Sequence, residues 1–204
     1  MGDCFVVCDA GGGTVDLISY RISSLIPLQL NEVAIGTGAL CGAVYLDRRF
    51  EDFVSKRIGK DKFDAMDHRA RFQMNQFWET YVKREFVDDE GVQRDEEEEE
   101  ENENKLFWVP MMGVPDSEDK GIRGGFLKLS RLVWSRVMGY AVASRYAGAN
   151  GGWENRREVK EIFEPIVAQV LELISKQVIE VLKSGKGPIA VIMPCRWCYV
   201  HAKP

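Results

Sequence analysis

The sequence lacks a long hydrophobic run. None of its 204 residues belongs to a stretch of the 18 or so apolar residues that a membrane-spanning helix requires. The first residues, Met1-Gly2-Asp3, also lack the basic start of a secretory leader, and the apolar run behind them is too short for one. We therefore expect a cytoplasmic protein without a membrane partner.

Disulfide bonds and a nucleic-acid-binding surface are not indicated either. The five cysteines are odd in number and scattered, so we expect reduced thiols instead of a disulfide framework. The net charge of -5 gives no basic surplus for nucleic acid. Residues 88–103 hold eleven acidic residues and one arginine, a net -10, which leaves +5 for the rest of the chain. That mildly basic remainder is compatible with a polyanionic ligand such as a nucleotide.

The most informative stretch has three consecutive glycines between two apolar runs. Residues 4–10 and 15–22 are rich in β-branched and aromatic side chains and predict a strand, a tight turn at Gly11, Gly12 and Gly13, and a second strand. No Gly-Lys-Ser/Thr follows and no helix opens, which excludes a Walker A loop and a dinucleotide-binding fingerprint. A glycine-rich hairpin without a ligand remains the alternative.

Three glycines are costly to order, so the turn needs a reason for them. Glycine reaches positive φ, and without a Cβ it lets successive backbone N–H groups form a concave nest for phosphate oxygens. Thr14 adds a hydroxyl donor. Asp9 and Asp16 add carboxylates suited to Mg²⁺ or to orienting a water molecule.

Residues 9–16, Asp-Ala-Gly-Gly-Gly-Thr-Val-Asp, resemble the second phosphate motif of the superfamily of actin, Hsp70 and the sugar kinases. Residues 36–50 resemble the Hsp70 segment that follows, although Cys41 stands where Hsp70 usually has the first glycine of a pair. The chain is similar to the divergent Hsp70-like proteins common in fungi, over most of its length. The resemblance implies an α/β fold, the actin-like ATPase (ribonuclease H-like) lobe, whose mixed sheet begins as an antiparallel meander and continues with helices and a parallel strand.

The resemblance covers only the second lobe of the nucleotide-binding domain, so we expect residues 1–204 to form a single, incomplete lobe. It implies ATP and Mg²⁺ as ligands. The amides of residues 11–13 would hold the β- and γ-phosphates, and Thr14 would bind the γ-phosphate. Asp9 would hold Mg²⁺ or orient the attacking water, and Asp16 would support it from outside the metal's own ligands, which makes these two the expected catalytic residues.

Apolar periodicity predicts the remaining elements. Gly36-Thr37-Gly38 is expected to end the third strand and open a helix. An acidic, solvated loop is expected over residues 88–104, with a tail that docks a basic partner as the alternative. The predicted segments are strands at residues 28–35, 106–110, 121–129 and 189–193, helices at 39–58, 67–86 and 157–183, an insertion at 135–156 and an irregular tail at 194–204.

Four further binding residues are expected on the first two helices. Gly42 would let a phosphate lie close to the positive end of its helix, or would serve close helix packing. Glu79, Lys83 and Arg84 resemble the set that contacts adenosine in Hsp70, although the carboxylate and the lysine are one residue further apart than in that pattern. An ordinary surface ion pair at i,i+4 is the alternative.

The sequence also departs from the Hsp70 pattern. Residues 194–201 lack the Gly-Gly adenosine motif, and the first phosphate motif is missing. Cys195, Cys198 and His201 indicate a zinc site only weakly, because no second Cys or His pair lies nearby, so a reduced tail is the favoured interpretation.

These observations favour an Hsp70-like ATP-binding lobe, a remnant or fragment of a chaperone-type ATPase, with protein clients or co-chaperones as further partners. We expect negligible ATP hydrolysis by this chain alone. A non-catalytic interaction module that keeps the fold without nucleotide remains an alternative, as does a carbohydrate kinase of the same superfamily.

Overall fold

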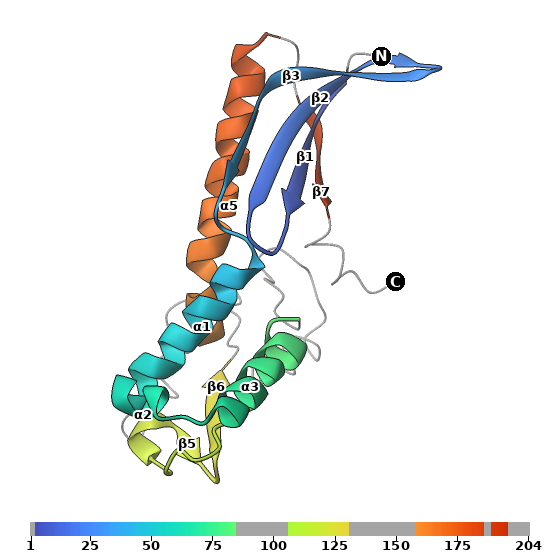
Figure 1. Cartoon of the computed structure of the whole chain (residues 1–204). Coiled ribbons are helices and arrows are strands. Elements are labelled where there is room, and N and C mark those ends of the chain that lie inside the picture. The colour runs from blue at the N-terminus through green and yellow to red at the C-terminus, as the bar shows by residue number, and fades with distance from the viewer. Residues whose placement is uncertain (1–2, 85–105, 131–157, 186–188, 196–204) are drawn as a thin grey trace, which may run out of the picture. The chain divides into compact units, whose positions relative to one another are not determined.

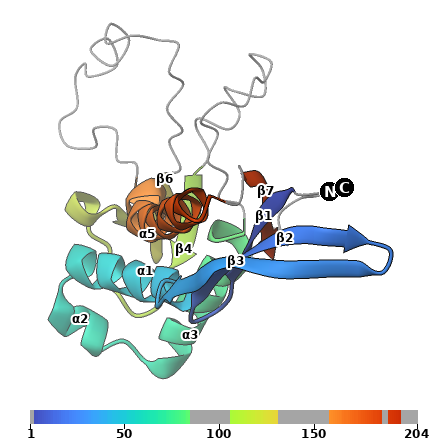
Figure 2. The ribbon, with the colours of Figure 1, turned by 90° about the horizontal axis from the view of Figure 1, so that it is seen from above.

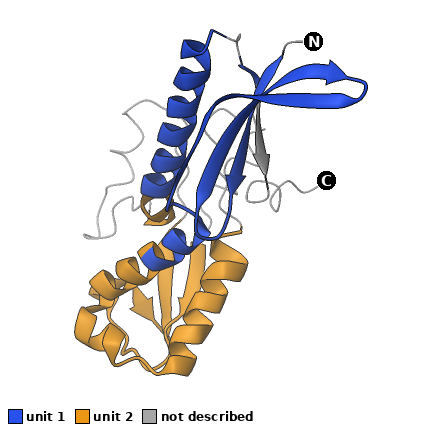
Figure 3. Cartoon of the chain, turned by 45° about the horizontal axis from the view of Figure 1, so that its top comes forward, with its two compact units in different colours: residues 1–48, 164–204 blue, residues 49–163 orange. Residues whose placement is uncertain are grey.

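The computed structural model divides the chain into two compact units (Figure 3). Unit 1 comprises Met1–Arg48 and Glu164–Pro204, and unit 2 comprises Arg49–Phe163. The fold class is mixed α/β, with a four-stranded mixed sheet and several helices. The structure describes the chain over residues 3–84, 106–130, 158–185 and 189–195.

Unit 1 is built on the four-stranded sheet. Its elements are β1 (Cys4–Ala10), β2 (Val15–Leu25), β3 (Leu28–Ala39), the start of α1 (Ala43–Ile58), most of α5 (Glu158–Lys183) and β7 (Ile189–Cys195). The strand order is β3-β2-β1-β7, with β1–β2 and β2–β3 antiparallel and β1–β7 parallel. This arrangement confirms the predicted antiparallel meander and the later parallel strand.

The sheet of unit 1 has one covered face and one open face. Alternate residues of β1 and β2 are buried, the pattern of a sheet packed on one side. α5 lies against the covered face (Figure 1). The covered face includes Cys4, Val6, Cys8, Leu17 and Ser19, and the open face includes Phe5, Val7, Asp9, Asp16, Ile18 and Tyr20.

A buried glutamine joins α5 to β2 and β3. The side chain of Gln177 is fully buried, and its Nε2 donates to Ser19 Oγ (2.7 Å) and to the carbonyl of Ile35 (3.3 Å). Its Oε1 accepts a hydrogen bond from Thr37 Oγ1 (2.9 Å). Because a buried polar group is costly unless it is paired, this network fixes the position of the helix on the sheet. The helix predicted over residues 157–183 is confirmed by α5.

The end of β3 differs from the prediction. Gly36 and Gly38 do not end the strand, since β3 runs through them to Ala39 and α1 begins later than predicted. A Cβ on Gly36 would lie 2.9 Å from the carbonyl oxygen of Leu17, and a Cβ on Gly38 would lie 2.4 Å from Asp16 Oδ1. These glycines allow β2 and its side chains to lie close to β3, a tertiary reason that local breaker propensity does not reveal.

The β2–β3 hairpin extends beyond β1 (Figure 2). β1 pairs with β2 only as far as Arg21, so residues 22–31 of the hairpin lie outside that pairing. Its end exposes four large apolar side chains: Leu25, Ile26, Leu28 and Leu30. A contiguous group of this kind is more informative than a single exposed apolar residue, because it marks a candidate contact surface.

Unit 2 combines short helices with a small antiparallel sheet. Its further elements are α2 (Lys60–Asp64), α3 (His68–Phe77), the π-helical segment η1 (Trp78–Val82), β4 (Leu106–Pro110), the 3₁₀ turn η2 (Glu118–Lys120), β5 (Ile122–Arg123) and β6 (Phe126–Ser130). The strand order is β4-β6-β5, which confirms the strands predicted in these regions. The single helix predicted over residues 67–86 is instead α3 followed by η1. α2 was not predicted, because five residues are too few for a periodic signal.

Aromatic packing and a buried ion pair hold unit 2 together. Trp78 stacks on Phe50, with ring centroids 4.4 Å apart and planes at 4°, and its ring centroid lies 5.7 Å from that of Phe163. Aromatic pairs of this kind contribute beyond their buried area.

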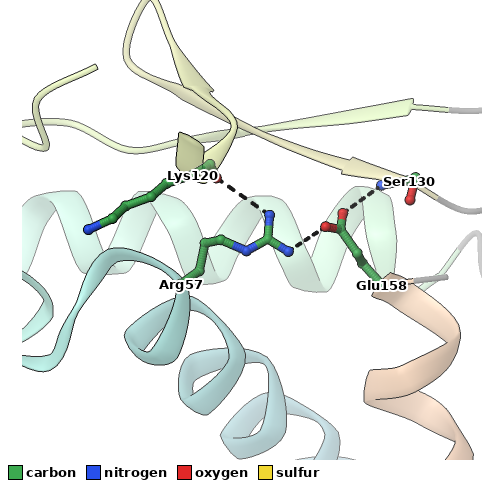
Figure 4. Close-up of polar contacts among 4 residues, drawn as sticks. All are labelled: Arg57, Lys120, Ser130 and Glu158. Atoms are coloured by element: carbon green, nitrogen blue, oxygen red, sulfur yellow. Dashed lines mark hydrogen bonds and ion pairs between the residues drawn. The ribbon is translucent and has the colours of Figure 1, made fainter. Parts of the chain in front are cut away.

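The ion pair of unit 2 joins Arg57 on α1 to Glu158 at the start of α5 (Figure 4). The second carboxylate oxygen of Glu158 accepts a hydrogen bond from Ser130 N (3.1 Å), and Arg57 Nη1 donates to the carbonyl of Lys120 (3.4 Å). Both charged side chains are largely buried, so each charge is compensated by the opposite charge of the other side chain.

Three predicted features fall partly or wholly outside the described residues. They are the acidic loop at 88–104, the insertion at 135–156 and the tail beyond residue 195. Pro194 and Cys195, the first residues of the predicted tail, belong to β7, which is the last strand of the sheet among the described residues, a position that tolerates proline. Within the ranges that the structure describes, no helix combines the length and apolar character needed to cross a bilayer.

Candidate functional site

The glycine loop, residues 11–14, joins β1 to β2 at one edge of the unit 1 sheet. The parallel strands β1 and β7 end at the same edge, where Asp9 pairs with Cys195. The carboxyl ends of parallel strands are a common place for ligands. One hydrogen bond closes the loop, from Gly11 N to the carbonyl of Thr14 (2.9 Å), and the last three residues of the loop are exposed.

The carbonyl groups of the glycine loop accept hydrogen bonds from the first amides of α1. These bonds run from Gly42 N to Gly13 O (3.2 Å), from Ala43 N to Gly11 O (3.1 Å) and from Val44 N to Gly12 O (2.8 Å). The first turn of α1 has no acidic residue, and a glycine stands where a capping side chain would be. The loop therefore supplies the acceptors that the start of a helix requires.

The amides of the same peptide groups point away from α1. In a trans peptide the N–H and C=O groups are directed oppositely, and the one cis bond in the described chain precedes Pro27. The carbonyls held by α1 share their peptide groups with the amides of Gly12, Gly13 and Thr14, so these amides face away from the helix. No residue that the structure describes accepts a hydrogen bond from them. The loop thus presents three successive backbone donors, although without the left-handed residue of the usual αR–αL anion nest.

The fold itself does not require glycine at two positions of the loop. Gly12 and Gly13 have no positive φ, and a Cβ on either would meet no atom within 4 Å. The expectation that these glycines provide positive φ is therefore wrong. The second expected reason for glycine is that it has no Cβ beside the backbone amides, and the geometry is compatible with that reason.

Asp9 and Asp16 occupy opposite register positions on β1 and β2, next to the glycine loop, and Oδ1 of Asp16 lies over Gly38 of β3. They are direct cross-strand partners and both are exposed on the open face of the sheet. Such partners have Cβ atoms about 4.5–5.5 Å apart, where like charges repel. A divalent cation relieves this repulsion, and Mg²⁺ is commonly held by one or two carboxylates together with water and phosphate. The pair fits Mg²⁺ in this respect, while the described part of the chain contains no group of three or more potential metal ligands.

Cys41 is buried close to Asp16. Its Sγ lies 3.8 Å from the carbonyl oxygen of Ala39, to which it donates a weak hydrogen bond. Burial, and to a lesser extent the negative charge of Asp16, raise the pKa of the Cys41 thiol above its ordinary value. The neutral thiol is therefore favoured, and Cys41 packs as a small apolar residue.

The other three predicted site residues belong to unit 2. Lys83 Nζ donates to Glu79 Oε2 (2.7 Å), so the ion pair considered as an alternative is formed. The side chain of Lys83 is 8% exposed and that of Glu79 is 50% exposed. Arg84 is exposed in the turn that follows η1. Their contact with adenosine stays a prediction.

Sequence reasoning identified the loop and its carboxylates but missed the contacts that hold the loop. Gly42 makes a close packing contact, and its amide already donates to the loop, so its closeness to a phosphate stays a prediction. The roles of Ala43 and Val44, and of Gly38 beneath Asp16, were not foreseen. A helix start without a Ser, Thr, Asp or Asn cap was the signal that another part of the chain supplies the acceptors.

Comparison with known proteins gives no family for this chain. No model of a protein family matches it, and no curated protein matches it either.

Proposed function

We propose that the glycine loop binds the phosphate groups of a nucleotide, as part of an Hsp70-like lobe of the actin-like ATPase superfamily. One observation carries the proposal. Gly12 and Gly13 need to be glycine neither for their φ angles nor for packing, yet their amides and that of Thr14 point away from α1 and donate to no described residue. A ligand that approaches the backbone closely accounts for both facts.

In this proposal the residues of the loop and its flanks have separate roles in binding. The three outward amides hold the β- and γ-phosphates, and the hydroxyl of Thr14 donates to the γ-phosphate. Asp9 holds Mg²⁺ or orients a water molecule, and Asp16 supports Asp9 from the neighbouring strand. Bound Mg²⁺ supplies positive charge that offsets the charge of the phosphate oxygens.

The proposal is tested by replacing the two unconstrained glycines. Alanine at Gly12 and Gly13 fits the space and removes chain entropy from the unfolded state, so the ligand-free double variant should be as stable as the wild type or slightly more stable. Its two methyl groups should keep phosphate oxygens away from the amides and weaken binding of Mg·ATP about tenfold or more. Calorimetric titration measures the affinity, and urea denaturation measures the stability.

A control changes the neighbouring β2–β3 hairpin, away from the loop. Gln29 is an exposed residue of β3 near the far end of the hairpin, and Gln29→Val should leave Mg·ATP affinity unchanged. Equal affinity of the wild type and of the Gly12→Ala/Gly13→Ala variant would count against the loop as the phosphate site.

The alternative function is a non-catalytic interaction module. The exposed apolar end of the β2–β3 hairpin, formed by Leu25, Ile26, Leu28 and Leu30, favours a protein contact. This alternative expects no heat of binding and no rise in melting temperature with millimolar Mg·ATP, whereas a nucleotide site raises the melting temperature by mass action. A chaperone-type role in the cytoplasm, with clients or co-chaperones, is part of the first proposal and depends on its outcome.

Any ATP hydrolysis also belongs to that proposal. We expect negligible turnover by this chain alone. Steady-state hydrolysis above background that is abolished by Asp9→Asn would contradict this expectation.

A further inference from the structure

We propose that Gly42 is a positioning residue for the glycine loop, and that α1 and a bound phosphate stabilise each other through the peptide groups of the loop. This inference rests on the proposed phosphate-binding function. It assigns a role to a part of the chain whose amides are already bonded within the protein and so do not contact the ligand.

Three successive peptide groups join residues 11–14. The carbonyl of each bonds to the start of α1, and the N–H of each points away from α1. Their carbonyls accept hydrogen bonds from Gly42, Ala43 and Val44, and their N–H groups are those of the proposed nest. Hydrogen bonds in series polarise one another, so an anion that accepts from the N–H strengthens the bond that the carbonyl makes with α1. The positive partial charge at the start of α1 thereby favours a negative ligand at the loop.

Gly42 makes this arrangement possible because it lacks a Cβ. A Cβ at this position would lie 2.6 Å from the carbonyl oxygens of both Gly11 and Gly12 and 2.7 Å from the carbonyl carbon of Gly12. All of these are backbone atoms, so a rotamer change cannot relieve the contact. The start of α1 and the loop must separate, and the three amides of the nest lose the support that orients them.

The experiment compares two Gly→Ala variants of unit 1, with pyrophosphate and Mg²⁺ as the probe. Gly42→Ala forces a contact with the loop, whereas Gly36→Ala forces a comparable backbone contact with Leu17 O, on β2 and outside the loop. At a temperature where both variants are folded, we expect Gly36→Ala to bind the probe as the wild type does. We expect Gly42→Ala to bind it about tenfold or more weakly, in the range of typical coupling between sites.

Hydrogen exchange in the wild type provides a second readout that a merely structural role would not change. Saturation with the probe should slow exchange at Ala43 and Val44 by a larger factor than at β3 amides remote from the loop, which report the general stabilisation that any ligand causes. This measurement decides the matter even if Gly42→Ala fails to fold.

The outcomes separate this inference from the proposed function. If pyrophosphate shifts the amide resonances of Gly12 and Gly13 but slows exchange at Ala43 and Val44 no more than at the remote β3 amides, the positioning role is overturned while the loop remains a phosphate site. Equal affinities of the Gly42→Ala and Gly36→Ala variants have the same meaning. If the wild type binds no pyrophosphate, the proposed function fails and the inference fails with it.

Discussion

At the scale of single residues, glycine serves two different purposes in unit 1. Gly36 and Gly42 each lie where a Cβ would come within 3 Å of a backbone atom of another segment, so the fold disfavours any larger residue there. A Cβ on Gly38 would come that close only to Asp16 Oδ1, the end of a side chain. Gly12 and Gly13 have open space around them. The sequence shows only that all five are glycine, and the distinction becomes visible from the packing of β2, β3 and α1.

This distinction predicts opposite outcomes for two substitutions. Gly36→Ala would place a methyl group 2.9 Å from the carbonyl oxygen of Leu17, a backbone atom that no rotamer change can move away. Such overpacking should lower the free energy of unfolding by about 1–3 kcal/mol. Gly12→Ala is the matched control and should not lower it. Urea denaturation of the ligand-free variants measures both, and equal losses in the two would contradict the assignment.

Cys41 predicts a loss of stability at alkaline pH. Its thiol has a raised pKa in the folded protein, through burial first and Asp16 second, so the folded state holds this proton more tightly than the unfolded state does. The stabilisation is therefore complete below the ordinary thiol pKa of 9.0 and is lost as pH rises above it. The free energy of unfolding should fall more steeply above pH 9 in the wild type than in Cys41→Ala. Parallel curves from denaturation at several pH values would show that the thiol has no such role.

At the scale of secondary-structure elements, two polar contacts position α5. Gln177 joins it to β2 and β3 in unit 1, and Glu158 joins its first turn to α1 and β6 in unit 2. Apolar periodicity predicted the helix itself, but it carries no information about which polar residues are buried. Nothing in the sequence around Gln177 shows that this polar residue is buried.

Removal of Gln177 should destabilise the chain markedly. Gln177→Ala leaves a cavity and deprives the buried Ser19 hydroxyl of its partner, which should lower the free energy of unfolding by about 2–4 kcal/mol. Ser175→Ala removes an exposed hydroxyl from the same helix and should change it by less than about 0.5 kcal/mol. Urea denaturation measures the two variants. A loss below 1 kcal/mol for Gln177→Ala would argue against the network, by the same scale of effects.

The ion pair of unit 2 should matter in a way that a surface pair does not. Glu158→Ala leaves the largely buried Arg57 without its counter-ion and should lower the free energy of unfolding by about 3–5 kcal/mol. Glu172 forms an exposed pair with Lys176 further along α5, and Glu172→Ala should cause little measurable change. If thermal denaturation gave similar effects for both, the buried pair would not hold the elements of unit 2 together.

Element boundaries were predictable where the pattern was local. The alternation of β1 and β2 and the long apolar stripe of α5 depend on residues close in sequence, so these elements agree with the prediction. The end of β3 depends on contacts of Gly36 and Gly38 with Leu17 and Asp16 of the neighbouring strand. Those tertiary contacts override local propensity, and a single sequence does not display them.

At the scale of the whole molecule, the chain consists of two compact units, and the described residues that bond to the glycine loop belong to unit 1. A short, local motif was enough to predict the loop, its carboxylates and a mixed α/β sheet. It was not enough to predict how α1 holds the loop, because that contact joins residues some thirty positions apart through backbone atoms. The actin-like ATPase lobe and its nucleotide remain our proposal.

The central claim, that the glycine loop binds nucleotide phosphates through its backbone amides, is tested most directly by a ¹⁵N–¹H NMR titration of the wild-type chain with Mg·ATP. The account predicts progressive shifts of the amide resonances of Gly12, Gly13 and Thr14, while Gly124 on the β5–β6 turn stays unmoved. Unchanged resonances of all three loop amides at millimolar Mg·ATP, in a folded sample, would contradict it.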